Sequence, residues 1–178
     1  MALSALGLIA ERGVHGMSIA DVLERSGAPR GSVYYHFPGG KDEMVLAAME
    51  YMATDARAPL AALKGSDAAG VIRGYVNLWR GVLTRSNFEA GCATAGLATS
   101  ADSDELKAAA RKVFDAWVSD LTDLFEGAGF TRPQAEEMAW MLEASTEGAL
   151  VFARAERSMR ALDLVERQLI ALAEQLAV

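Results

Sequence analysis

The sequence predicts an all-α protein of about nine helices. Apolar residues recur at spacings of three and four along most of the chain, whereas the alternation that marks a strand is scarce. Only four prolines interrupt the 178 residues, and 52% of the residues are apolar, which is enough to bury a core. No apolar run reaches the roughly 18 residues that a membrane-spanning helix requires, so we expect no membrane span.

Three short helices are predicted in the first 40 residues. The first of them stops at Gly13. Ser18 is a good N-cap for the second helix, and Asp21 stands three residues further on, as in a capping box. The third helix begins at Pro29, because proline suits the first helical position, and Pro38-Gly39-Gly40 ends it.

Six further segments carry the helical spacing. Their expected limits are about 41 to 58–65, 67–85, 92–99, 104–126, 132–157 and 163–178. Ser66 is the expected N-cap of the second of these helices. Thr131 and Gln134 form a capping box in front of the fifth.

The second and third helices, joined at Gly27, form a helix-turn-helix pattern. Pro29, Val33 and Phe37 recur every four residues, which predicts an inward stripe. The opposite face carries groups that suit a DNA surface: Arg30, Gly31, Ser32, Tyr34 and Tyr35. Arginine binds phosphates or guanine edges, and hydroxyl groups hydrogen-bond to phosphate oxygens. A three-helix unit without a role on DNA is the alternative interpretation.

The charge of the chain does not decide between these interpretations. The net charge is −7 and the isoelectric point is about 4.9, whereas DNA-binding domains are usually basic. Residues 1–41, however, hold four basic residues against three acidic ones, so the acidic excess lies in the remainder of the chain.

The segments Glu11–Gly13, Ser18–Val22 and Gly27–Phe37, followed by Lys41-Asp42-Glu43, are similar to the helix-turn-helix of the TetR family. The Pro38–Lys41 turn is one residue longer than the commonest family turn and resembles the LmrA/YxaF-like subgroup. Family members usually carry a basic arm and a full turn ahead of the point where Met1 stands here. The resemblance implies DNA contacts at these positions: Ser18, Arg30, Gly31, Ser32, Tyr34, Tyr35, His36 and Lys41.

The last two helices carry apolar stripes with heptad-like spacing. One stripe holds Leu162, Val165, Leu169, Leu172 and Leu176. The helix before it has two stripes: Met138, Leu142, Ser145, Ala149 and Phe152 on one, and Met141, Ala144, Gly148, Val151 and Ala155 on the other. Two stripes on one helix indicate burial on two sides. They fit an intrachain core, or the four-helix dimer interface that the resemblance implies, and we expect a homodimer.

Most bulky aromatic residues lie in the middle helices, where they predict either core packing or the lining of a cavity for a small ligand. The resemblance favours a ligand cavity. The candidate ligand-binding residues are Trp79, Phe88, Cys92, Phe114, Trp117 and Trp140. The segment 91–98 also resembles a Gly-Cys segment of the LmrA/YxaF-like subgroup.

We find no arrangement of residues that supports catalysis, so we expect no enzyme. With one cysteine and two distant histidines, no zinc motif can be written, and we expect neither a metal nor a cofactor. A lone cysteine and the absence of a signal-peptide pattern favour the cytoplasm.

The expected organisation is a helix-turn-helix DNA-binding domain at 1–40 and a ligand-binding and dimerisation domain at 41–178. The expected function is that of a repressor that binds a palindromic operator as a dimer and is released by a small hydrophobic or aromatic inducer. The alternatives are a small-molecule-binding helical protein that has lost DNA binding, and an enzyme on an unfamiliar helical fold.

Overall fold

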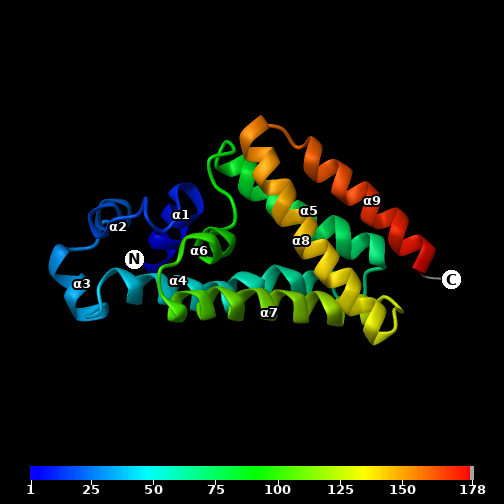
Figure 1. Ribbon diagram of the computed structural model, residues 1–178, viewed down its shortest axis with the longest axis horizontal. Coiled ribbons are helices and arrows are strands. Elements are labelled where there is room, and N and C mark those ends of the chain that lie inside the picture. Colours follow the sequence, from blue (N-terminus) through cyan, green and yellow to red (C-terminus); the bar gives the residue numbers. More distant parts are fainter. Residues whose placement is uncertain (177–178) are drawn as a thin grey trace. The chain divides into compact units, whose positions relative to one another are not determined.

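The computed structural model describes residues 1–176, and within them the chain is all-α, with no strand (Figure 1). Its α-helices are α1 (Ala2–Arg12), α2 (Ile19–Ser26), α3 (Arg30–His36), α4 (Lys41–Ala53), α5 (Ala68–Arg85), α6 (Ala93–Ser100), α7 (Asp104–Gly127), α8 (Arg132–Glu156) and α9 (Arg160–Leu176). A 3₁₀ segment, η1 (Asp55–Leu63), lies between α4 and α5. The predicted fold class is therefore confirmed.

The helices form two compact units. The first contains Met1–Ala56 and Cys92–Phe114, and the second contains Arg57–Gly91 and the described residues from Asp115 onward. The first unit thus extends beyond the segment 1–40 that we expect to bind DNA, because α4, α6 and the first half of α7 pack with the short N-terminal helices.

Helix α1 is the centre of the first unit. It packs against α2, α4 and α6 (Figure 1). Leu8 and Ile9 of α1 are buried, as are Val22 of α2 and Met44 of α4. Gly96 of α6 lies close to the backbone of α1, where a Cβ would stand 3.8 Å from the carbonyl oxygen of Ile9. The helix-turn-helix is therefore anchored on α1.

The second unit is built on α5, α8 and α9, which pack against one another in pairs. Helices α8 and α9 run side by side in opposite directions (Figure 1). Ile72, Leu142 and Leu169 are buried representatives of the three helices, and Phe125 contributes a buried ring from the second half of α7. Burial of these apolar side chains is the main force that holds the unit together.

Several expected helix limits were wrong, and for α4 and α5 the reason is local. Helix α4 ends at Ala53 and is followed by η1 because Pro59 has no N–H and crowds the preceding turn of an α-helix. Asp67, not Ser66, caps α5, since its carboxylate accepts a hydrogen bond from the N–H of Gly70 at 2.7 Å. Helix α9 begins at Arg160, three residues before the expected start.

None of the described helices combines the length and the apolar character needed to cross a membrane.

Candidate DNA interface and ligand-binding core

Ser18 and Gly27 fix the limits of α2, as the sequence predicts. The N–H of Asp21 donates to Ser18 Oγ at 3.2 Å, and the N–H of Ser18 donates to Asp21 Oδ2 at 2.9 Å. This capping box satisfies two backbone donors at the start of the helix. Gly27 then adopts a left-handed conformation (φ 67°), and its N–H donates to the carbonyl of Leu23. The chain is thereby turned towards α3.

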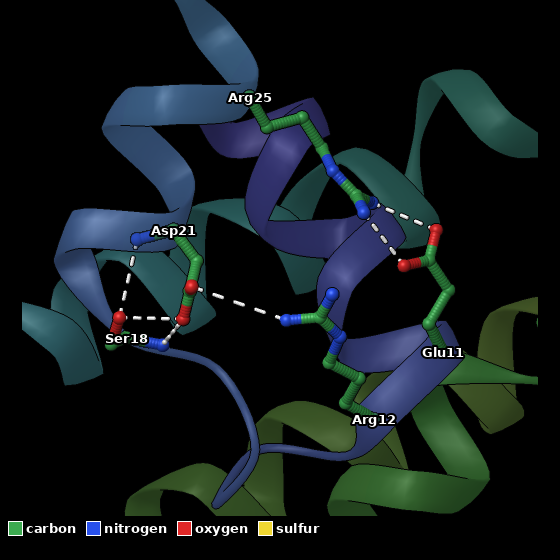
Figure 2. Close-up of polar contacts among 5 residues, drawn as sticks. All are labelled: Glu11, Arg12, Ser18, Asp21 and Arg25. Carbon is green, nitrogen blue, oxygen red and sulfur yellow. Dashed lines mark hydrogen bonds and ion pairs between the residues drawn. The ribbon is translucent and has the colours of Figure 1, made fainter.

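Two ion pairs hold α2 against α1 (Figure 2). The guanidinium of Arg25 donates to both carboxylate oxygens of Glu11, at 2.8 Å and 2.6 Å. Arg12 approaches Asp21 at the longer distance of 3.9 Å. The hydrogen bond from Arg25 lowers the pKa of Glu11, and the hydrogen bonds from Ser18 lower the pKa of Asp21. The capping residues of α2 are thus also tied to α1.

Helix α3 buries one side chain and exposes most of the others. Val33 is buried, as predicted, whereas Tyr34 and Tyr35 are 77% and 83% exposed. Large aromatic side chains with this exposure are uncommon unless they form an interaction surface. Pro29 does not belong to an inward stripe, because it is exposed and is the N-cap of α3 and not its first helical residue.

Most of the predicted DNA-binding residues lie on α3 of the first unit, and they differ in exposure. Five of them are exposed on α3: Arg30, Gly31, Tyr34, Tyr35 and His36. Ser32 is half-buried, and its hydroxyl donates to the carbonyl of Pro29 at 2.6 Å. The rings of Tyr35 and His36 meet edge to face, with centroids 4.9 Å apart. Ser18 is exposed at the start of α2, and Lys41 is half-buried in the first turn of α4.

Gly31 is not explained by packing within the chain. A Cβ built at this position meets no atom within 4 Å, and the backbone has ordinary helical geometry. Glycine in a helix costs roughly 0.5–1 kcal/mol relative to alanine. A surface glycine with that cost is expected where another molecule must approach the backbone closely.

An aromatic and acidic cluster lies inside the second unit. Trp117 of α7 contacts two rings of α5, with centroid distances of 6.0 Å to Tyr75 and 6.4 Å to Trp79. The hydroxyl of Tyr75 donates to the carboxylate of Glu143 on α8. Glu143 is only 5% exposed, and Tyr75 is fully buried. We name these four residues the aromatic–acidic cluster.

Burial governs the ionisation of this cluster. Loss of hydration raises the pKa of Glu143 to about 7, against the hydrogen bond from Tyr75, which lowers it. Burial, with the nearby carboxyl of Glu143, also raises the pKa of Tyr75. Two further polar atoms, Trp79 Nε1 and Thr146 Oγ1, are buried without a hydrogen-bond partner in the described part of the chain. Groups of this kind in a protein interior often mark a binding site.

Sequence reasoning missed Tyr75 and Glu143, although a signal for Glu143 exists. Ala139, Glu143, Thr146 and Leu150 follow one another at helical spacing, and all four are buried. An acidic residue within a stripe of apolar or small residues predicts a buried carboxyl. The contact with Tyr75 had no local signal, because the two residues are 68 positions apart.

Among the predicted ligand-binding residues, the ring contacts in the described part of the chain join Trp79 to Trp117. Trp140 is 49% exposed on α8. Phe88 is half-buried after α5, with the guanidinium carbon of Arg157 5.9 Å from its ring centroid. Cys92, the N-cap of α6, and Phe114 belong to the first unit.

An apolar stripe of α8 is exposed in the single chain. Its members are Met141, Ala144, Gly148, Val151 and Ala155. The adjoining side chains of Trp140 and Phe152 are also exposed, as is Leu164 of α9. The stripe that begins at Leu162 differs, since both Leu162 and Leu169 are buried within the chain. That stripe of α9 is therefore part of the intrachain core.

Two family models match separate segments of this chain. Residues 4–48 match a family model described as bacterial regulatory proteins of the tetR family. Residues 68–168 match the C-terminal domain of LmrA/YxaF-like transcriptional regulators.

Two relatives illustrate the similarity in sequence. An HTH-type transcriptional regulator of Mycobacterium tuberculosis is 37% identical, over 95% of this chain and 90% of the relative. The HTH-type transcriptional regulator LmrA of Bacillus subtilis is 27% identical, over 83% of this chain and 81% of its own length.

Solved structures share the fold. A TetR transcriptional regulator from Legionella pneumophila superposes with a TM-score of 0.84 at 20% identity, covering 96% of this chain and 94% of that one. A regulatory protein TetR from Rhodobacter sphaeroides gives 0.83 at 24% identity, covering 94% of both chains.

Proposed function

This chain belongs to the TetR family of bacterial transcriptional regulators, and we propose that it is a repressor that binds a palindromic operator as a homodimer and leaves it when a small molecule binds. The observation that carries the proposal is the outer face of α3, where exposed polar and aromatic side chains surround a glycine that the fold does not require. A helix of a helix-turn-helix that is inserted into a major groove needs such a face.

Different residues would have different roles on DNA. Arg30 would bind a phosphate or the edge of a guanine, and the hydroxyl of Tyr34 would bind a phosphate oxygen. Gly31 would let the backbone of α3 approach the groove closely. Ser18 at the start of α2 and Lys41 at the start of α4 would contact phosphates, since helix N-termini attract anions. Ser32, Tyr35 and His36 complete the proposed contact surface.

The exposed stripe of α8 supports a homodimer. Met141 and Val151 would be covered by the same stripe of a second chain, as expected for a two-fold interface. Small residues such as Ala144 and Gly148 permit close approach of helices, and a Cβ at Gly148 meets no atom of its own chain. A dimer of this kind would present two copies of α3 to the two halves of a palindrome.

The aromatic–acidic cluster supports the proposal that the inducer binds in the second unit. Binding sites for small molecules are mainly apolar and aromatic, with a few polar groups that orient the ligand. Trp79 and Trp117 provide apolar walls, and Glu143 and Thr146 provide polar groups. The ligand would favour release from DNA only if it binds the DNA-free conformation more tightly.

The test is binding of the purified dimer to DNA from the region upstream of its own gene, measured by fluorescence anisotropy at several salt concentrations. The proposal expects specific binding that weakens as salt rises, because phosphate contacts release counterions. Equal affinity for upstream DNA and random DNA would contradict it. Ligand binding without any DNA binding would favour the alternative, a ligand-binding protein that has lost its operator.

A further inference from the structure

We propose that the small molecule bound by the second unit is an organic cation with an apolar or aromatic body, held by the carboxylate of Glu143 and the rings of Tyr75, Trp79 and Trp117. This inference rests on the proposed role of that unit in binding the inducer, and it names the chemical class of the ligand.

The first reason is the position of the Glu143 carboxyl. It is buried, and among the described residues its hydrogen-bond donor is the hydroxyl of Tyr75, with no lysine, arginine or histidine paired to it. A buried carboxylate without a positive partner is costly, so it tends to stay protonated. A cationic ligand would supply the missing charge.

The second reason is the set of aromatic rings that is joined to this carboxyl through Tyr75. Trp117 lies between Tyr75 and Trp79, at 6.0 Å and 6.4 Å, and all three rings are buried. The faces of aromatic rings carry negative partial charge and attract ammonium groups, most strongly where water is excluded. An aromatic wall beside an acid therefore selects a cation over an anion of the same shape.

The third reason is the polar atoms that remain without partners. Thr146 is fully buried one turn after Glu143, and its hydroxyl oxygen has no hydrogen-bond partner in the described residues. The indole N–H of Trp79 lies near enough to Tyr75 to affect its pKa, yet it completes no hydrogen bond in that part of the chain. A ligand with a polar group beside its charge would satisfy such atoms.

Two ionisable groups act on Glu143, and neither of them carries a positive charge. They are Tyr75 on α5 and, one turn further along α8, Glu147. The negative charge of Glu147 raises the pKa of Glu143, as burial does. Binding of a cation must oppose both effects, so it must displace the proton from Glu143. Affinity for a permanent cation should therefore rise with pH through the pKa of about 7.

The experiment compares two probes of the same shape, benzyltrimethylammonium and neopentylbenzene, in which carbon replaces the charged nitrogen. Benzoate serves as an anionic probe. Binding to the full-length dimer is measured by calorimetry and by quenching of tryptophan fluorescence at pH 6 and pH 8. We expect the affinity for benzyltrimethylammonium to rise about ten-fold over this range, the affinity for neopentylbenzene to stay constant, and benzoate to bind least.

The variant Glu143→Gln keeps an acceptor for Tyr75 but removes the charge. It should weaken binding of benzyltrimethylammonium about ten-fold at pH 8 and abolish the pH dependence of that binding. The affinity for neopentylbenzene should stay within about two-fold of the wild-type value. Glu137→Gln, an exposed residue on the same helix, is the matched control and should change nothing. If Glu143→Gln does not fold, two measurements on the wild type still test the inference. They are the pH dependence of benzyltrimethylammonium affinity and the release of a proton on binding, measured by calorimetry at pH 7.

Three results would overturn the inference: equal binding of the charged and neutral probes, a cation affinity that is flat with pH, or a cation affinity unchanged in Glu143→Gln. If the chain binds upstream DNA but shows any of these results, the ligand class is wrong and the proposed repressor function stands. If the cation binds as expected but DNA does not, the ligand class stands and the repressor function fails.

Discussion

Arg25 on α2 donates two hydrogen bonds to the carboxylate of Glu11 on α1, at 2.8 Å and 2.6 Å. The pair connects the first helix of the helix-turn-helix with the central helix of its unit. Gly7 leaves room for the arrangement, since a Cβ there would lie 3.0 Å from Nη1 of Arg25. A bidentate contact of this kind fixes the relative orientation of the two side chains as well as their distance.

Glu11→Gln should lower the free energy of unfolding at pH 7 by about 0.5 kcal/mol, up to about 1, because the pair is partly exposed. The folded-state pKa of Glu11 lies below its ordinary value of 4.5, so this stability is present above that value and is lost as the pH falls through the folded pKa. Urea unfolding at pH 7 and pH 3.5 measures it. Glu24→Gln, an exposed neighbour, is the control. A difference that persists unchanged at the lower pH would exclude the ion pair as its cause.

Gly31→Ala should separate folding from DNA binding. The added Cβ meets open space, and alanine favours a helix by up to about 1 kcal/mol, so the variant should be as stable as the parent or more stable. Binding to upstream DNA should nevertheless fall, because the methyl group stands between α3 and the groove. Thermal unfolding and anisotropy measure the two effects. Unchanged DNA affinity would show that α3 does not approach DNA through this residue.

Arg30→Ala should weaken binding to DNA. If Arg30 reads a base edge, the loss is about 1–3 kcal/mol and specificity relaxes at one position of the site. If it contacts only phosphate, affinity falls alike for all sequences and the salt dependence becomes shallower by about one charge. Arg73→Ala removes the same charge from an exposed position on α5 and should have no effect. Equal DNA affinity of the two variants would show that Arg30 of α3 does not contact DNA.

Val151→Glu should convert the dimer into a folded monomer. Val151 is 69% exposed in the single chain, so the charge is tolerated there, but it would be buried without a partner in a dimer formed through α8. Light scattering and circular dichroism measure mass and helicity. Leu3→Glu, an exposed substitution on α1, is the control. Leu169→Glu should instead unfold the chain, because Leu169 is core. A dimer that survives Val151→Glu places the interface elsewhere.

Glu143→Gln should change how stability depends on pH. The folded-state pKa of Glu143 is about 7, above the ordinary value of 4.5, so the folded form holds a proton that the unfolded form has lost between these values. Wild-type stability should therefore fall as the pH rises from 4.5 to 7, by roughly 3 kcal/mol in total, and level off above. The variant should lack this fall. Urea unfolding of both proteins at pH 5 and pH 8 tests this prediction. The same change in stability with pH in both proteins would show that Glu143 is not the cause.

Features that depend on neighbouring residues were predictable from sequence. Gly13, Ser18 and Gly27 limit their helices by capping chemistry that acts within four residues, and each limit was predicted. The burial of Val33 followed from helical spacing in the same way. Failures arose where two local signals competed: Asp67 prevailed over the adjacent Ser66 as the cap of α5.

Features that depend on distant residues were not predictable. Two apolar stripes on α8 were expected, but spacing alone could not show that Leu142 faces the chain's own core while Val151 remains exposed. The cluster of Tyr75, Trp117 and Glu143 forms only when α5, α7 and α8 are packed, so its ionisation has no local signature. Trp79 and Trp117 were predicted to bind a ligand because they are large aromatic residues. That prediction found two members of the cluster but not its acid, Glu143.

The burial pattern of α3 has a consequence for how regulators of this kind diversify. Val33 is the single buried residue of this helix among those the structure describes, while Arg30, Tyr34, Tyr35 and His36 carry almost no share of the packing. Substitutions at the outer positions can therefore accumulate after gene duplication with little penalty in folding. A descendant could acquire a new target sequence by neutral drift on the outer face of this seven-residue helix while the remaining architecture is preserved.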